Sequence, residues 1–275
     1  MAKARQQTLV ILFASFSLLA GCVSRPAHDA GPSTSRVPAG RLPGDAVPRE
    51  EPRSRYGNPP NYQVYGQTYK VLTSSHGYQE RGVASWYGKK FHGRMTSSQE
   101  PYDMYEMTAA HKTLPLPTYV RVRNLKNNRS IIVRVNDRGP FVDNRLIDLS
   151  YSAAVKLDMI RDGTSLVEVT AISFDEPPTV AQSNATIPVS KSRRPEPEAT
   201  IFVQAGAFGD VSNARRRFAL LKNGGVGPVF VDQDKSTSPA LYRVRIGPIA
   251  NAIQYDSIVE ELQKLGITDT HLVTE

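Results

Sequence analysis

The chain has 275 residues and a formal net charge of +8 at pH 7, and its only cysteine is Cys22. A single cysteine excludes an intramolecular disulfide, so hydrophobic cores must stabilise the folded parts without a cross-link. The basic residues are spread along the chain without a dense block. This argues against nucleic acid as a partner and fits a diffuse attraction to the anionic polymers of a cell envelope.

The first 22 residues carry the features of an export signal in the usual order. Two basic residues come first, and Thr8 to Leu19 is an apolar stretch too short to span a bilayer as a stable helix. Small residues then precede the cysteine in Leu19 to Cys22, a segment that resembles the lipobox of bacterial lipoproteins. The resemblance implies that residues 1–21 are removed and that fatty acids such as palmitate are attached at Cys22.

Several acyl chains on one residue make an effectively permanent membrane anchor. The next residue is Val23, not the aspartate that resembles an inner-membrane retention signal, so the outer membrane is favoured and the chain faces the periplasm. The alternative is an ordinary signal peptide cleaved near Gly21, with an incidental cysteine.

Two stretches rich in proline and small polar residues divide the mature chain. Residues 23–60 and 175–199 contain few large apolar side chains, so neither can bury enough surface to fold by itself. Asn58 to Tyr78 is more aromatic and is expected to pack along the first domain. The predicted organisation is a lipidated N-terminus with a tether (22–79), a first domain (80–174), a flexible linker (175–199) and a second domain (200–275).

The first domain has mainly the patterns of short β-strands. One helix is expected at Ser150 to Leu157, capped by Asp148 or Ser150. Many short strands with one inserted helix predict a small closed barrel. The expected strands are Val83 to Tyr87, Tyr119 to Arg123, Ile131 to Val135 and Leu166 to Phe174.

Five segments of this domain resemble the rare lipoprotein A family, in order and at family-like spacing. They are Gly82 to Gly88, Phe91 to Gly93, Met107 to His111, Val135 to Phe141 and Leu146 to Ser150. The resemblance implies a mainly β double-psi β-barrel, related to expansins. It also implies cleavage of peptidoglycan glycan strands that lack stem peptides, since several members of the family are lytic transglycosylases.

Cleavage of a β-1,4 glycosidic bond needs an acid for the leaving oxygen and stabilisation of an oxocarbenium-like centre. A lytic transglycosylase needs no activated water, because the C6 hydroxyl of muramic acid attacks and closes a 1,6-anhydro ring. One carboxyl can therefore act first as acid and then as base. The candidate catalytic residues are Asp137, His111, Glu100, Asp103 and Asp148.

Residue type alone makes Asp137 a turn aspartate that bonds its own backbone. The matching family position is required for cleavage, so the resemblance makes Asp137 the first choice for acid and base. By the same resemblance, His111 is expected to orient Asp137 or tune its pKa, with a core histidine as the alternative. Asp148 is either a helix N-cap or the partner of Asp137, since the matching aspartate of expansin-like barrels is catalytic.

Glu100 and Asp103 match acidic positions of active family members, which implies a place at the rim of the cleft; by type alone they are solvated loop carboxylates. Gln99 stands where a glycine is expected before the acid, which could shift this loop. Trp86 and Tyr87 are candidates for stacking on sugar rings, with a place in the core as the alternative. The histidines are scattered and no free thiol remains, so neither a metal nor a cofactor is expected.

The second domain contains an internal repeat. Ile201 to Phe208 and Tyr242 to Ile249 align with each other, and each is followed by a helical pattern and a further strand. This predicts a small α+β unit, β-α-β-β-α-β, with a ferredoxin-like sheet. The repeat also resembles the signature of SPOR domains, which implies binding of glycan strands without stem peptides at the division septum. The residues expected to hold glycan, or else to be ordinary solvent-facing residues, are Gln204, Tyr242, Arg243 and Arg245.

The sequence therefore predicts an outer-membrane-anchored lytic transglycosylase of the septum, with division proteins as candidate partners. Its second domain would select the same glycan that the barrel cuts. One alternative is a non-catalytic, expansin-like lipoprotein that binds peptidoglycan. Another is a purely structural tether between the outer membrane and the cell wall.

Overall fold

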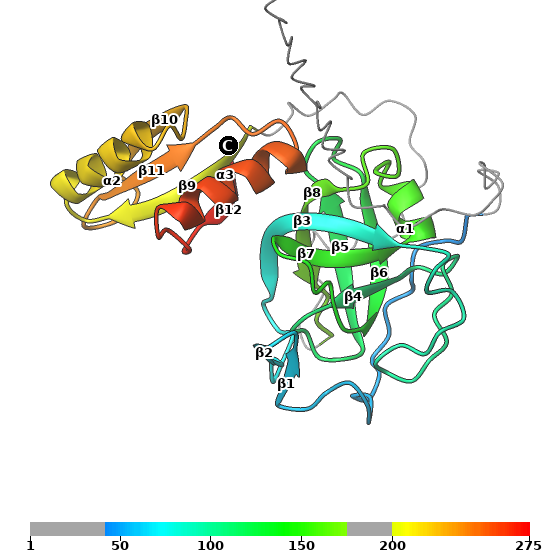
Figure 1. Ribbon diagram of the computed structural model, residues 1–275. Helices are drawn as coiled ribbons and strands as arrows, with labels where there is room; N and C mark the ends of the chain where they lie inside the picture. Colours follow the sequence, from blue (N-terminus) through cyan, green and yellow to red (C-terminus); the bar gives the residue numbers. More distant parts are fainter. Residues whose placement is uncertain (1–41, 175–199) are drawn as a thin grey trace, which may run out of the picture.

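The computed structural model describes residues 42–174 and 200–275, which form a β-barrel domain and a smaller α+β domain (Figure 1). The predicted signal peptide, the lipid attachment at Cys22 and the linker 175–199 lie outside the described residues. Within the two described ranges, no helix is both long enough and apolar enough to cross a membrane.

The first domain is a closed barrel of six strands in the order β3-β7-β4-β6-β5-β8 (Figure 1). Two neighbouring pairs, β3 with β7 and β4 with β6, are parallel, and the other pairs are antiparallel. The predicted double-psi β-barrel is thereby confirmed. The strands are β3 (Gln79–Tyr87), β4 (Thr108–His111), β5 (Thr118–Asn124), β6 (Ser130–Asp137), β7 (Arg145–Ser150) and β8 (Ser165–Ala171).

Alternate side chains of these strands fill the barrel. Val120, Val133 and Leu149 are fully buried in one apolar cluster, as the period-two pattern of the sequence requires. Residues between them therefore point out of the barrel, and this outward direction is what makes Asp148 available as a site residue.

The one helix of the barrel, α1 (Tyr151–Lys156), follows β7 directly. Its N-cap is Ser150, whose side chain accepts a hydrogen bond from the Ala153 backbone N–H. Of the two cap residues that the sequence allows, the structure uses Ser150. Asp148 lies two residues earlier, inside β7, and is free of the capping role.

Residues 42–58 form an extended strap along the barrel. Composition assigns this stretch to the tether, but the structure differs from residue 42 onward. The Ala46 N–H donates to the Ile132 carbonyl at 3.0 Å, and the Asp45 carboxylate pairs with Lys156 at 2.7 Å. Polar contacts hold the strap where few apolar side chains are available, which is why composition predicts a linker.

Two arginines of the barrel fasten this strap and the residues after it. Arg134 forms an ion pair with Glu51 at 2.8 Å, and Arg138 donates to the Gly57 carbonyl at 2.8 Å and to Asn58 Oδ1 at 3.1 Å. The guanidinium of Arg138 also lies over the Tyr62 ring. The hairpin of β1 (Asn61–Val64) and β2 (Gln67–Lys70) follows.

The second domain is a four-stranded antiparallel sheet in the order β10-β11-β9-β12 with two helices on one face. Asp210 and Asn251 cap the helices by accepting from backbone N–H groups. The β-α-β-β-α-β prediction is confirmed. The elements are β9 (Ile201–Phe208), α2 (Val211–Asn223), β10 (Val229–Asp234), β11 (Leu241–Ile246), α3 (Ala252–Lys264) and β12 (His271–Thr274).

The second domain rests on the barrel through α3 and β12, and β12 runs beside β3 (Figure 1). Arg145 at the start of β7 forms an ion pair with Asp256 of α3 at 2.9 Å. Val83, Leu125 and Leu166 of the barrel belong to the same buried apolar cluster as the core of the second domain. The contact therefore combines apolar burial with one charged pair.

The Glu51 carboxylate attaches the strap to Arg134 and Tyr119 of the barrel. Burial works to raise its pKa, but hydrogen bonds from Arg134, Tyr119 and Arg49 outweigh burial and lower the pKa to about 2. The folded-state pKa lies below that of an unfolded glutamate, about 4.3. The stability from this carboxylate is thus fully present above about pH 4.3 and is lost as the pH falls through 2.

Glu51→Gln is expected to lower the free energy of unfolding at pH 7 by about 2–3 kcal/mol, because it removes this carboxylate. Urea unfolding at pH 7 and at pH 3 measures the effect, and the difference from wild type should shrink at pH 3. Glu50→Gln, at the exposed neighbouring position, is the matched control. The same difference at both pH values would contradict this role of Glu51.

Candidate active site

Strand register places two aspartates on either side of one small residue. Asp148 of β7 is the partner of Ser85 in β3 and of Ala110 in β4, and Ala110 is in turn the partner of Asp137 in β6. The four residues form a row across four neighbouring strands. Two strand spacings separate the aspartate Cα atoms, roughly 10 Å.

The residues between the two aspartates have small side chains. Ala110 is 4% exposed and carries only a methyl group. Gly139, in the turn after β6, lies beside it, since a Cβ built on Gly139 would be 3.9 Å from the Ala110 Cβ. Gly139 has a φ of +134°, which side chains other than hydrogen rarely allow. Only small groups, the Ala110 methyl and the Gly139 backbone, therefore lie along the line between the two aspartates.

Asp148 is the more enclosed carboxyl. Burial raises its pKa, and the hydrogen bond that Ser85 Oγ donates to Asp148 Oδ1 opposes this only in part, together with the charges of Arg145 and Lys112. Asp137 is close enough to raise the pKa of Asp148 further. The protonated form of Asp148 is thus favoured more than in an ordinary aspartate.

Asp137 is held by three donors on one oxygen. Its Oδ1 accepts from the Ser97 N–H at 2.8 Å, from Ser97 Oγ at 2.7 Å and from the Arg138 N–H at 2.7 Å. The bond from the next residue is the turn geometry that residue type alone predicts. The bonds from Ser97 add a second function, because they tie the loop of residues 88–107 (the rim loop) to the end of β6.

Glu100 lies in the rim loop but is occupied by an arginine. Arg134 donates to both of its oxygens, at 2.7 and 3.0 Å, and Asn136 donates at 2.9 Å. Burial alone would raise the pKa of Glu100, but these hydrogen bonds lower it below its usual range. Gln99, where a glycine was expected, has a left-handed φ of 68°, so the backbone keeps a conformation that glycine adopts without strain.

Asp103 sits at the outer side of the rim loop. Its carboxylate accepts from the Tyr105 N–H at 2.9 Å and lies 3.6 Å from His92 Nδ1. About half of its side chain is exposed. These contacts join Asp103 to the loop itself and not to the row of Asp148 and Asp137.

His111 is a buried, neutral residue, 2% exposed. Burial lowers its pKa to about 3, with Arg138 and Lys112 contributing. Nδ1 accepts from the Thr113 and Leu114 N–H groups, so the proton sits on Nε2, which is 2.8 Å from Tyr78 Oη.

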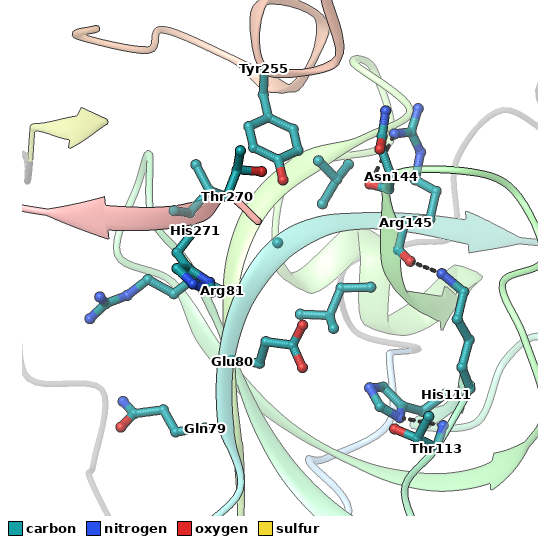
Figure 2. A pocket seen from close by; sticks show the side chains of 15 residues that line it. Gln79, Glu80, Arg81, His111, Thr113, Asn144, Arg145, Tyr255, Thr270 and His271 are labelled. Carbon is teal, nitrogen blue, oxygen red and sulfur yellow. Dashed lines mark hydrogen bonds between the residues drawn. The ribbon is translucent and has the colours of Figure 1, made fainter. Parts of the chain in front are cut away.

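A chain of contacts leads from this histidine to the surface. The Tyr78 hydroxyl donates to Glu80 at 2.8 Å, and His111 and Glu80 both line one cavity (Figure 2). No hydrogen bond joins the His111 ring to Asp137 in the described residues. The two are linked through Arg138, which donates to the His111 carbonyl at 3.1 Å.

The two strand aromatics pack inside the protein. Tyr87 is 7% exposed, and its ring stacks on Tyr102 with 4.1 Å between centroids. Trp86 meets Tyr151 edge to face at 5.7 Å and is partly exposed. Their contacts are those of core residues, and the covered face of Tyr87 is closed to a sugar.

The glycan candidates of the second domain do not share one face. Gln204, Arg243 and Arg245 point to the sheet face opposite the helices, where Arg243 lies 3.4 Å from Gln204 Oε1. Tyr242 alternates with Arg243 along β11, so its side chain points to the opposite face of the sheet. There it packs, like Phe208, against the core beneath the helices. Its neighbourhood is apolar, so only three of the four candidates form a polar surface together.

Sequence reasoning missed the residues that organise this site. Ser85 and Ala110 were inside family-like segments, and strand alternation would have placed them outward with Asp148. Ser97 and Arg134 had no sequence signal, because their partners are far along the chain. Among the described residues, no group of three or more acidic, histidine or cysteine side chains could hold a metal ion.

Comparison with known proteins identifies both domains. Residues 79–169 match the family described as "Lytic transglycolase", and residues 197–271 match the SPOR domain. The chain is 40% identical over 230 residues to an "Endolytic peptidoglycan transglycosylase RlpA" of Vibrio cholerae, covering 84% of this chain and 82% of that protein. A protein of the same name from Pseudomonas aeruginosa is 36% identical over 298 residues, covering 92% and 86%.

The His111 ring is expected to stay neutral, with its proton on Nε2, between pH 5 and 8, because its pKa is about 3. Long-range ¹H–¹⁵N NMR of the imidazole nitrogens tests this, with the exposed histidines as internal references. A titration of the His111 signals near pH 6 would show that the ring gains a proton close to neutral pH, and it would contradict a buried, neutral His111.

Proposed function

The chain belongs to the RlpA family of endolytic peptidoglycan transglycosylases, and from this membership we infer that it cuts peptidoglycan glycan strands by the lytic transglycosylase reaction. It is a lyase that acts on a polysaccharide, leaves 1,6-anhydro-muramic acid ends and consumes no water. The observation that carries the assignment of its site is the row in which Ala110 separates Asp148 from Asp137.

Asp148 acts first as the acid and then as the base. Its carboxyl donates a proton to the oxygen that joins muramic acid C1 to the next sugar, and the C1–O bond breaks. The carboxylate then accepts the proton of the C6 hydroxyl as O6 bonds to C1. The raised pKa of Asp148, caused by burial, supports this role because an acid must hold its proton before the cut.

The Asp137 carboxylate stabilises the positive charge that develops at C1 and the ring oxygen in the transition state. Three donors fix its carboxylate on the far side of Ala110, so it needs no rearrangement as charge develops. The sequence favoured Asp137 as acid and base with Asp148 as its partner. The enclosure of Asp148 supports the reverse division of roles.

Two other predicted site residues, Glu100 and His111, hold neighbouring segments of the chain in place. Glu100 forms an ion pair with Arg134 and thereby holds the rim loop against β6. His111 fixes the turn after β4 and, through its carbonyl, Arg138 beside Asp137. Asp103 and Trp86 are partly exposed and remain candidates for contact with sugar.

The SPOR domain delivers the barrel to glycan strands that lack stem peptides. Gln204, Arg243 and Arg245 form the polar surface that suits such a strand, and each arginine is already oriented by a carboxylate of β10. Cys22, with its acyl chains, would hold the chain at the outer membrane, with the septum as the place of action. This agrees with the lipobox-like sequence and with the SPOR domain.

Digestion of glycan strands without stem peptides, followed by mass spectrometry, tests the reaction and the two roles. Wild type should release products with 1,6-anhydro-muramic acid ends. Asp148→Asn should slow their release by about 10²–10⁴-fold, because the general acid is lost, and Asp137→Asn should slow it as well. Asp158→Asn, at an exposed ion pair on the same domain, is the control.

Two results would change this assignment. Activity retained in Asp148→Asn but lost in Asp137→Asn would return the acid and base role to Asp137. Wild-type protein that binds the strands, is folded and releases no product would favour the non-catalytic binding alternative.

Ala110→Leu should lower kcat/KM by at least tenfold while the chain remains folded. Residue 110 lies between Asp148 and Asp137 in the strand register, so a leucine side chain would project between the two carboxylates. Overpacking is expected to lower the free energy of unfolding by about 1–3 kcal/mol, so a thermal melt accompanies the assay. Ala110→Gly keeps the space open and is the matched control. Wild-type rates in Ala110→Leu would show that substrate does not enter between the two carboxylates.

A further inference from the structure

A cavity of about 510 Å³ lies between the barrel and the SPOR domain (Figure 2). Its volume is within the range of about 300–1,000 Å³ that is typical of ligand sites. Glu80 and Arg145 form part of the barrel wall, and Tyr255 and His271 of the SPOR domain face them across the cavity (Figure 2). The mechanism above makes no use of this space.

Lys112 is the unusual member of the cavity wall. Its side chain is half-buried, and its ammonium donates to the Arg145 carbonyl. Among the residues that the structure describes, no carboxylate forms an ion pair with it. The two arginines of the same wall are paired, Arg81 with Glu168 at 2.6 Å and Arg145 with Asp256 at 2.9 Å.

An ammonium taken partly out of water without a carboxylate partner is costly, unless a ligand supplies the anion. Burial accordingly lowers the pKa of Lys112, although Asp143, Asp148 and Glu80 act at longer range to raise it. Glu80 is exposed and already accepts a hydrogen bond from the Tyr78 hydroxyl. One carbonyl uses one of the three ammonium donors, so two are left for a ligand.

The position of Lys112 relative to Asp148 connects the cavity to the chemistry. Lys112 follows the last residue of β4 and reaches the first residue of β7, three residues before Asp148. At about 3.3 Å per residue, these three residues span roughly 10 Å. One or two sugar rings cover such a distance, so a strand cut at Asp148 can place a neighbouring substituent at Lys112.

The glycan itself has one kind of anionic group. Each muramic acid carries a lactyl carboxyl, which is bound as an amide while a stem peptide is attached and is a free carboxylate once the peptide is gone. We propose that Lys112 binds this lactyl carboxylate and thereby gives the barrel its own selectivity for strands without stem peptides, in addition to that of the polar SPOR surface. This inference rests on the proposed function, because it takes the glycan strand as the substrate.

Two matched substrates test the proposal with the full-length protein: strands with free lactyl carboxylates, and the same strands after conversion of these groups to methylamides. Wild type is expected to cut the carboxylate strands with at least a tenfold higher kcat/KM, since bonds to charged groups are the stronger ones. Lys112→Gln should lower kcat/KM on the carboxylate strands and bring the ratio of the two substrates close to one.

Two further variants separate charge from structure. Lys112→Arg keeps the charge and should keep most of the preference. Lys126→Gln removes an exposed lysine on another part of the barrel and should behave as wild type. Thermal melts show that each variant is folded. A wild-type ratio in folded Lys112→Gln would overturn the proposal.

Failure of the proposed function gives a different pattern. Wild-type protein that cuts neither strand contradicts the reaction, and calorimetric binding of the same two strands then decides the role of Lys112. A preference for carboxylate strands that Lys112→Gln removes supports the proposal. A preference that is equal in wild type and Lys112→Gln overturns it, because the selectivity then belongs to the SPOR domain.

Discussion

The proposed active site depends on the register of four neighbouring strands in a closed barrel. Parallel pairing of β3 with β7 and of β4 with β6, around an antiparallel centre, aligns Ser85, Asp148, Ala110 and Asp137 in one row. The register is strongly specified because Ile147 and Leu149, on either side of Asp148, are fully buried. A slip of one residue would turn Asp148 into the core and the side chains of Ile147 and Leu149 into solvent.

Arg134 in β6 and Arg138 just after it tie the neighbouring segments of the chain to the strand that carries Asp137. Arg134 binds Glu51 of the strap and Glu100 of the rim loop, and Arg138 binds the chain at Gly57 and the turn after His111. Glu100, a candidate catalytic residue in the sequence, is thus engaged in holding the rim loop. Asp148, by contrast, is enclosed, and burial raises its pKa.

In the proposed function, both domains bind the same polymer, the barrel at the bond that breaks and the SPOR domain farther from it. The SPOR sheet presents Arg243 and Arg245 as fixed cations, each with a carboxylate partner, which suits binding without chemistry. Lys112 forms no ion pair with a carboxylate of residues 42–174 or 200–275, and it lies near enough to Asp148 for the two charges to interact. Selection of the strand would then occur twice, once by the domain that recruits the chain to it and once beside the bond that breaks.

The sequence by itself determined the two fold classes and indicated the segments that hold the proposed site, because strand alternation, helix caps and family-like motifs are local properties. Only the tertiary structure decided which carboxyl is enclosed, that Ser150 and not Asp148 caps α1, that Tyr242 faces the helices, and that the strap from residue 42 belongs to the barrel. These outcomes depend on contacts such as Ser85 with Asp148, or Glu51 with Arg134, between residues more than 60 positions apart. Composition and spacing do not encode which distant polar groups meet; the closed barrel and its register do.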